Sequence, residues 1–332
     1  MTYNRIQYID ALKFIAIFAV IAIHVFSLNT DAEILHFKIN TFHQIFRFAV
    51  PIFLMITGAL FLNKHINLKE YFKKRFNRVI YPLIFFSILL FVFFKNTEFL
   101  YYYWYAWMMI GVLFTIPIIN KFIQNSTEKE IEYYIIVFVF FSIIQQVFTI
   151  YNIKYALDIT FFITPVSYLI LGYYLSIKEF KSPSKIILIS LVVFVISTIC
   201  KIKFGSFIFN NSFHTYLDLS LFQILQSTAI FLIIKYLYSS KEGIFKSINN
   251  LLNYPLINKI ILSISKSSYG MYLIQHPLIY SIIKPEFVKL SLSGSGTLIL
   301  SIIIIICVFL ISWIIIMILG KIPYLNKLIG YY

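Results

Sequence analysis

Long apolar stretches recur along the whole chain, and they constrain its fold more than any other feature of the sequence. A helix needs about 20 mostly apolar residues to cross the hydrocarbon core of a bilayer, and tilted or protein-covered helices tolerate fewer. The stretches of about this length are residues 9–28, 46–62, 79–95, 99–119, 134–151, 159–177, 186–200, 217–238, 267–283 and 298–319. We therefore predict an all-α polytopic membrane bundle of about ten transmembrane helices, folded as a single domain over residues 1–332.

The composition supports a lipid environment and excludes a soluble fold. Apolar and aromatic residues make up 60% of the chain and charged residues only 12%, whereas soluble domains are about half apolar and a quarter charged. The net charge of +15 would suggest a nucleic-acid partner in a soluble protein. Here the charges lie in short connections between apolar stretches, and most of the 28 Lys and Arg residues fall on one side. The positive-inside rule makes that side cytoplasmic, so we expect N-in and C-in topology and no nucleic-acid partner.

A weaker apolar segment, residues 245–265, does not fit the pattern of the ten spans. It is interrupted by Asn249, Asn250, Asn253, Pro255 and Asn258. A segment of this kind suits the boundary between lipid and water better than the hydrocarbon core. We expect it to lie on the cytoplasmic surface of the membrane.

The first predicted helix carries three ionisable residues, Asp10, Lys13 and His24. Such groups are costly inside a membrane unless they are paired or face a wet cavity. Asp10 and Lys13 are three residues apart and close enough to pair. Lys13 and His24 share a face because 11 residues make about three turns, and they are separated by roughly 16 Å. The pattern predicts a polar stripe that runs from the cytoplasmic end toward the outer leaflet. The alternative is that Asp10 and Lys13 reach the headgroups and His24 bonds a neighbouring helix.

Several short blocks of the sequence resemble the acyltransferase-3 family of integral membrane acyltransferases. The family's first helix has a basic residue and then, after ten residues, a histidine, as Lys13 and His24 have here. Further blocks follow in the family's order: RFAVPIFLMITG at 47–58, KRFNRVIYP at 74–82, YWYAW at 103–107, GYY at 172–174 and SYGMYLIQHP at 268–277. Each block is weak alone, but together they span most of the chain, and ten helices is the family's core.

The resemblance implies an enzyme of the cell membrane. Members of the family transfer an acyl group, often acetyl, from cytoplasmic acyl-CoA to a hydroxyl of a sugar outside the cytoplasm. By resemblance, the co-substrate here is acetyl-CoA or another acyl-CoA. The acceptor is a cell-surface polysaccharide or a lipid-linked oligosaccharide.

Acyl-CoA is a polyanion made in the cytoplasm, so its phosphates need cations at the inner face, where arginine offers bidentate geometry. Arg75 and Arg78 are three residues apart at the inner end of the third predicted helix, and Lys74 adds to the patch. In an α-helix the two arginines share a face. We predict that these three residues bind the phosphates of acyl-CoA. The alternative is a topological cluster of the positive-inside kind.

The pantetheine arm would then lie along the stripe of the first helix and bring the thioester close to His24. A sugar hydroxyl needs a general base when it attacks, and histidine has a suitable pKa range. We predict that His24 is this base, and that Lys13, with Asp10 as its partner, orients the arm or compensates charge. No zinc-ligand spacing is present in the sequence, and we expect no metal.

The reaction also needs a donor for the oxyanion. Arg47, Tyr103 and Trp107 are candidates for this role or for binding the acceptor, and the sequence does not choose among them. His276, which precedes Pro277, either lines the acceptor side or bonds a carbonyl that the proline frees. Arg47 has the alternative of a plain anchor at the interface.

Two other classes of membrane protein compete with the transferase interpretation. A flippase or transporter for a polysaccharide intermediate would carry ionisable residues midway along several helices, whereas here they concentrate in the first helix and at inner ends. A glycan polymerase typically uses a large outer loop, and the longest outer connection here, residues 29–45, is modest.

Overall fold

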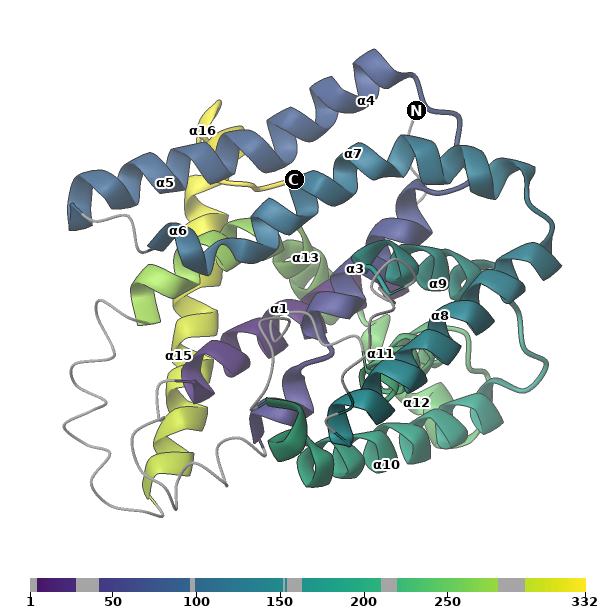
Figure 1. Ribbon diagram of the computed structural model, residues 1–332. Helices are drawn as coiled ribbons and strands as arrows, with labels where there is room; N and C mark the ends of the chain where they lie inside the picture. Colours follow the sequence, from purple (N-terminus) through teal and green to yellow (C-terminus); the bar gives the residue numbers. More distant parts are fainter. Residues whose placement is uncertain are drawn as a thin grey trace. The chain divides into compact units, whose positions relative to one another are not determined.

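The computed structural model describes residues 5–27, 42–95, 99–151, 153, 163–209, 220–279 and 296–332. Within these residues every regular element is a helix and no strand occurs (Figure 1). The elements, labelled as in Figure 1, are α1 (Gln7–Phe26), α3 (Ala49–Phe61), α4 (Leu68–Arg75), the π-helix η1 (Phe76–Ile80), α5 (Tyr81–Phe94), α6 (Phe99–Tyr102), α7 (Trp104–Asn125), α8 (Glu128–Ile150), α9 (Pro165–Ile177), α10 (Pro183–Phe209), α11 (Leu221–Leu237), α12 (Gly243–Leu252), α13 (Pro255–Pro277), α15 (Gly296–Leu319) and α16 (Leu325–Leu328). The all-α prediction is confirmed.

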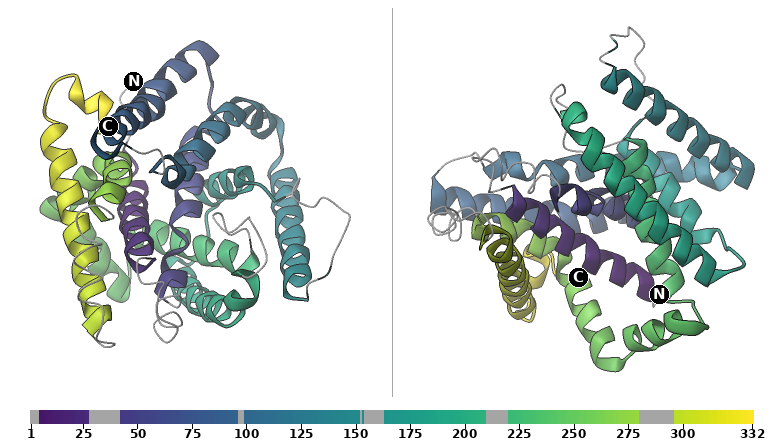
Figure 2. Two further views of the ribbon diagram at one scale, coloured as in Figure 1. Left: turned by 60° about the vertical axis from the view of Figure 1, so that its left-hand side comes forward. Right: turned by 90° about the horizontal axis from the view of Figure 1, so that it is seen from below.

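Seven of the described helical segments are long and apolar enough to cross a membrane. They are Gln7–Phe26, Phe42–Phe61, Leu68–Phe93, Trp104–Asn125, Glu128–Phe148, Pro183–Lys203 and Leu298–Leu319. Two shorter apolar helices, α9 and α11, accompany them. The outer surfaces of these helices suit lipid: α15, for example, exposes Ile299, Ile303 and Ile311 and runs uninterrupted in every view (Figure 2). Ten spans with both termini in the cytoplasm remain a prediction.

Three boundaries differ from the sequence prediction. The third span begins not at residue 79 but at Leu68, because α4, η1 and α5 follow one another without a break (Figure 1). The seventh, expected as a short span over 186–200, is the 27-residue helix α10. The helix α13, which contains the start of the ninth predicted span, begins at Pro255 and is not among the seven candidate spans. Proline suits the first turn of a helix because its missing N–H has no partner there anyway.

The expected surface segment 245–265 is therefore not one element. Its first part belongs to α12, which has no buried residue, and its second part is the beginning of α13. The starts of the spans predicted at 159 and 217, and the end predicted at 283, lie outside the described residues.

The chain divides into two compact units, to which α1, α7 and α13 each contribute residues. Unit 1 comprises Met1–Ala16, Arg47–Lys64 and Ile118–Lys259. In it α10 packs along α11, and α3 packs on α9. The α3–α9 contact needs two glycines: a Cβ on Gly58 would lie 1.8 Å from the carbonyl oxygen of Leu169, and one on Gly172 would lie 2.2 Å from that of Met55. Contact this close fixes the two helices against each other.

Unit 2 comprises Ile17–Phe46, His65–Pro117 and Ile260–Tyr332. Its core includes the Phe18 ring, whose centroid lies 5.6 Å from that of Phe309 on α15. The Tyr269 hydroxyl of α13 donates to the carbonyl oxygen of Val79 at 2.9 Å, and the indole N–H of Trp313 donates to Ser263 Oγ at 3.1 Å. These bonds connect α13 to η1 and to α15 within the unit.

Candidate functional site

A polar pair lies where the last turns of α1 and α13 meet in unit 2. His24 Nδ1 on α1 lies 2.7 Å from Gln275 Nε2 on α13, although 251 residues separate them in sequence. Gln275 is fully buried, and His24 is partly buried. The His276 ring packs edge-on against the His24 ring, with 5.9 Å between their centroids. Two imidazoles and one amide therefore form a cluster where the last turns of α1 and α13 meet.

Aromatic residues at the end of α6 and in the turn that follows it hold the end of α13 that carries this cluster. The Tyr102 ring stacks on the His276 ring with 3.7 Å between centroids. The buried Tyr103 hydroxyl donates to the carbonyl oxygen of Leu273 at 2.7 Å. Gly270 allows the opposite side of α13 to approach Ile329, whose carbonyl oxygen would lie 2.3 Å from an added Cβ. The turn of α13 that bears Gln275 and His276 is thus fixed from two sides.

The structure separates the candidates from the aromatic block at 103–107. Tyr103 lies close to the cluster through α13, but its hydroxyl proton is engaged by the Leu273 carbonyl. Trp107 is 52% exposed, which is a position for contact with lipid. Tyr102, which the sequence did not single out, is the residue of this region that contacts His276.

Gln275 was also missed. The block SYGMYLIQHP was noted for its likeness to the family, yet only its histidine was selected as a functional candidate. A glutamine within an apolar stretch is as useful a sequence signal as a histidine, because an amide that becomes buried needs a specific hydrogen-bond partner. Here that partner is His24.

The inner end of α1 carries a second polar cluster, in unit 1. Arg5 Nε donates to Asp10 Oδ2 at 2.7 Å, and Arg5 Nη2 donates to Asn258 Oδ1 at 2.5 Å. Asp10 is 8% exposed, so this bond offsets part of the cost of burying a carboxylate. Lys13 is partly buried one turn further along α1. Arg5 is thus a partner of Asp10 and joins it to the start of α13, while the pairing of Asp10 with Lys13 remains a prediction.

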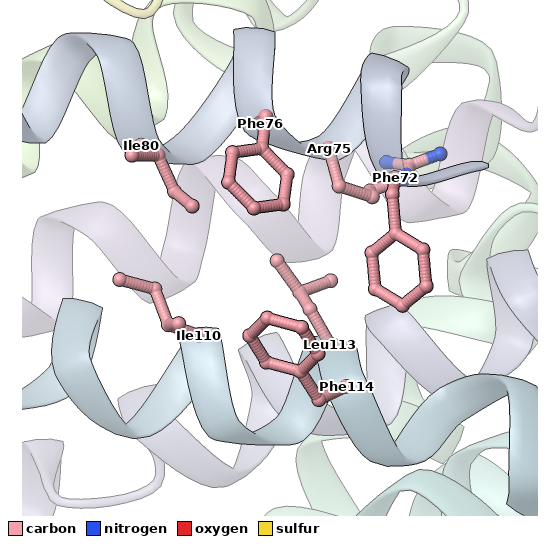
Figure 3. Close-up of a pocket in the computed structure, with 7 residues that line it drawn as sticks. All are labelled: Phe72, Arg75, Phe76, Ile80, Ile110, Leu113 and Phe114. Atoms are coloured by element: carbon pink, nitrogen blue, oxygen red, sulfur yellow. The ribbon is translucent and has the colours of Figure 1, made fainter. Parts of the chain in front are cut away.

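Arg75 borders a small pocket between the α4–η1 segment and α7. Figure 3 shows Phe72, Phe76 and Ile80 on one side of it and Ile110, Leu113 and Phe114 on the other. The Arg75 guanidinium carbon lies 5.6 Å from the centroid of the Tyr71 ring. The Tyr71 hydroxyl donates to the Leu113 carbonyl oxygen at 3.0 Å and so ties α4 to α7. The site is an apolar, aromatic pocket with one cation at its edge.

Arg75 directly precedes the π-helix η1, and Arg78 lies within it, so the turn that joins them is wider than that of an ordinary α-helix. That the two arginines share one face remains a prediction. Arg78 is exposed, and its guanidinium carbon lies 5.2 Å from the centroid of the Tyr332 ring. The two arginines therefore have different neighbours.

The remaining cationic candidates lie at the surface or near the start of a helix. Lys74 is exposed and lies 3.6 Å from the Glu70 carboxylate, a contact worth little in water. Burial raises the pKa of Tyr332, beside Arg78, to about 12. Arg47 occupies the turn before α3 and is partly buried. In unit 1 its neighbour Phe48 packs edge-on against Phe194 of α10, with 6.1 Å between ring centroids.

In the part of the chain that the structure describes, no three His, Cys, Asp or Glu residues are grouped so that they could hold a metal ion.

A comparison with protein families gives one match that covers almost the whole chain. Residues 6–317 match the family model described as an acyltransferase domain. No curated protein and no solved structure matches the chain.

Proposed function

The chain belongs to the acyltransferase-3 family of integral membrane acyltransferases, and on that premise we propose that it O-acylates a glycan. The donor is cytoplasmic acyl-CoA, with acetyl-CoA the first choice. The acceptor is a hydroxyl of a cell-surface polysaccharide or a lipid-linked oligosaccharide at the cell membrane. The observation that carries the proposal is the bond between His24 and Gln275, because it gives an imidazole a fixed orientation on the helix that also bears Lys13.

The chemistry assigned to His24 is that of a general base. Its Nε2 takes the proton of the acceptor hydroxyl while the hydroxyl oxygen bonds to the thioester carbon. The resulting tetrahedral oxyanion collapses, the carbon–sulfur bond breaks, and the proton held by His24 passes to the leaving thiolate. The products are the acyl ester and free CoA thiol. His276, 5.9 Å from His24 between ring centroids, is close enough to contact the acceptor or the oxyanion.

The donor end of the proposal rests on the cations of the inner face. Arg75, Arg78 and Lys74 are assigned to the phosphates, and Lys13, with Asp10 beside it, to the pantetheine arm. Because η1 gives the two arginines different neighbours, they would contact different phosphates rather than clamp one. Arg47 and Tyr103 stay as acceptor-side candidates, and Trp107, exposed on α7, is the weakest of them.

The test of this function is acyl transfer by membrane vesicles that expose the cytoplasmic face. Acetyl-CoA labelled in the acetyl group is supplied on that face, and label is counted in the glycan fraction. His24→Ala is expected to lower the rate by at least about 100-fold, since positioned bases contribute roughly 10²–10⁴. His65→Ala, which changes an exposed histidine, is the matched control and should retain full activity. Normal transfer by His24→Ala would reject the mechanism, and no transfer by the unaltered chain with any acyl-CoA would reject the function.

The topology is part of the same proposal. We infer ten spans with both termini in the cytoplasm, which places the Arg75 patch on the side where acyl-CoA is made. Single cysteines, introduced after replacement of Cys200 and Cys307, can be labelled with an impermeant maleimide on intact cells. A cysteine at Lys74 should be labelled only after the cells are opened. Labelling at that position from outside would invert the topology and remove the donor site.

A further inference from the structure

We propose that Gln275 is a positioning residue that selects the tautomer of His24, its side-chain carbonyl accepting the Nδ1 proton during acyl transfer. The inference rests on the proposed function, because it assumes that His24 acts as the base. It adds a residue that the sequence motifs did not assign and a mechanism by which that residue acts.

The first support is the geometry of the pair. The Gln275 side chain reaches Nδ1 of His24 at 2.7 Å, a full hydrogen bond, from a completely buried position. The two ends of a glutamine amide have nearly the same shape, and rotation by 180° exchanges the NH₂ group with the carbonyl oxygen. Either end can therefore occupy the place next to the ring.

The second support is the other end of the same amide. Gln275 Oε1 is buried, and among the residues that the structure describes it has no hydrogen-bond partner. No second bond from these residues opposes rotation of the amide. Its orientation is then decided by what the His24 ring requires.

The two orientations correspond to the two neutral tautomers of His24. With the NH₂ group toward the ring, Nδ1 accepts and the ring proton lies on Nε2, so Nε2 cannot take a proton from the acceptor. With the carbonyl toward the ring, Nδ1 carries the proton and Nε2 has a free lone pair. Only the second arrangement provides the base, and it is the one that we assign to the reacting enzyme.

The surroundings of His24 contain no better candidate for this task. A carboxylate is the usual partner that orients a catalytic histidine, but no Asp or Glu among the described residues lies within ion-pair distance of His24. The titratable groups facing it are the His276 ring, edge-on at 5.9 Å, and the Tyr102 ring stacked behind His276. The side chain that reaches Nδ1 is that of Gln275.

The experiment compares two variants that keep the size of the side chain. Gln275→Glu can only accept from Nδ1–H when ionised, and Gln275→Met can neither accept nor donate strongly. If the carbonyl is the working end, Gln275→Met loses about 10- to 100-fold in kcat with little change in KM for acetyl-CoA. Gln275→Glu keeps most of the activity. Its carboxylate stabilises the imidazolium, so the acidic limb of the pH–rate profile moves to higher pH by about one unit.

Two outcomes would overturn the proposal, and each has a distinct meaning. Wild-type activity in Gln275→Met would show that the amide is only packing. A Gln275→Glu variant as inactive as Gln275→Met, while folded and binding acetyl-CoA, would show that the NH₂ group donates to the ring. Gln124→Met, at an exposed glutamine, serves as the neutral control.

A spectroscopic measurement keeps the proposal testable even if Gln275→Glu does not fold. Imidazole ¹⁵N shifts of His24, assigned by their loss in His24→Ala, report which nitrogen carries the proton. The wild-type enzyme with a ketone analogue of acetyl-CoA should show Nδ1–H, and Gln275→Met should show a mixture. A wild-type ring protonated on Nε2 would overturn the assignment. Full transfer by His24→Ala in the same assay would instead reject the proposed function, so the two failures are distinguishable.

Discussion

The buried lysine of unit 1 has an acceptor for each of its N–H groups, whereas the buried Gln275 amide of unit 2 has a partner at only one end among the described residues. Lys235 on α11 is 7% exposed. Its ammonium donates to the carbonyl oxygens of Leu175, Ser176 and Lys178 at 3.0, 3.1 and 2.8 Å. These three carbonyls terminate α9, so the cation caps the negative end of a helix dipole. Every N–H of the ammonium has a protein acceptor.

In unit 2 the comparable buried group is left open. Gln275 uses one end of its amide on His24, and the other end has no partner among the described residues. A closed network rigidifies a fold, whereas an unsatisfied buried polar group costs stability and usually has another purpose. The closed network around Lys235 in unit 1 is that of a scaffold, and we assign the open cluster of Gln275 and His24 in unit 2 to the chemistry of the proposed function. The predictions that follow test this division.

The largest effect is expected where α3 and α9 touch in unit 1. Gly172→Ala puts a Cβ 2.2 Å from the Met55 carbonyl oxygen, and a backbone atom cannot move aside cheaply. Overpacking typically costs 1–3 kcal/mol, and we expect about 3 kcal/mol or more here, measured by thermal unfolding in detergent. Gly111→Ala, on α7 with nothing within 4 Å of the added Cβ, is the control and should be neutral or slightly stabilising. Equal unfolding of the two variants would mean that the helices are not in close contact.

The next effect in size concerns the closed network itself. Lys235→Met removes the cation from three carbonyls and from the Glu179 carboxylate, which lies 3.1 Å away. Hydrogen bonds to charged groups contribute about 1.5–3 kcal/mol each, and part of that is offset because the buried charge is removed as well. We expect about 3 kcal/mol of lost stability, with turnover per folded molecule unchanged. Lys181→Met, an exposed lysine, should change neither. If Lys235→Met instead kept its stability and lost turnover, the division between the units would be wrong.

A smaller loss of stability is expected at the second buried lysine of unit 1. Lys201 on α10 is 2% exposed, and its ammonium donates to Gln223 and Gln226 of α11. Gln226 in turn donates to Thr198 Oγ1 at 2.8 Å. Lys201→Met keeps most of the volume but leaves two amide oxygens without their donor, at a cost of about 2 kcal/mol. The check is the urea or detergent midpoint, and an increase in stability would count against a structural role.

The smallest change in stability is predicted for the open cluster. Gln275→Met removes a single hydrogen bond and also an unsatisfied buried oxygen, two effects of opposite sign. We expect a change of less than about 1 kcal/mol, although the same substitution is predicted to lower turnover. A loss of stability as large as that of Lys235→Met would show that Gln275 has a structural role and would contradict its assignment as a positioning residue for His24.

The helical architecture was predictable because it depends on local composition. Apolar stretches of membrane-spanning length identify helices whatever they pack against, and α15 was located at 298–319 within two residues of its observed start. The placement of Asp10, Lys13 and His24 on one helix was also predictable, since one apolar stretch contains all three. That they form a polar stripe remains a prediction.

The partners of these residues depend on packing between distant segments, which periodicity does not contain. The bond from Gln275 to His24 joins α13 to α1, and the bond from Arg5 to Asn258 joins the N-terminal residues to the start of α13. The π-helix was hidden for a different reason. A widened turn hardly changes the sequence pattern. The KRFNRVIYP block therefore has the pattern of an ordinary α-helix, although five of its residues form a π-helix.

The π-helix η1 separates the winding of α4 from that of α5 within the third span. Removing one residue from η1 and restoring α-helical winding would rotate α4 relative to α5 by about 100°. The apolar length of α5 would stay the same, while Arg75 would turn away from the α7 side of its pocket (Figure 3). A single insertion or deletion in η1 would thus turn the cations at the end of α4 without changing the apolar length of α5.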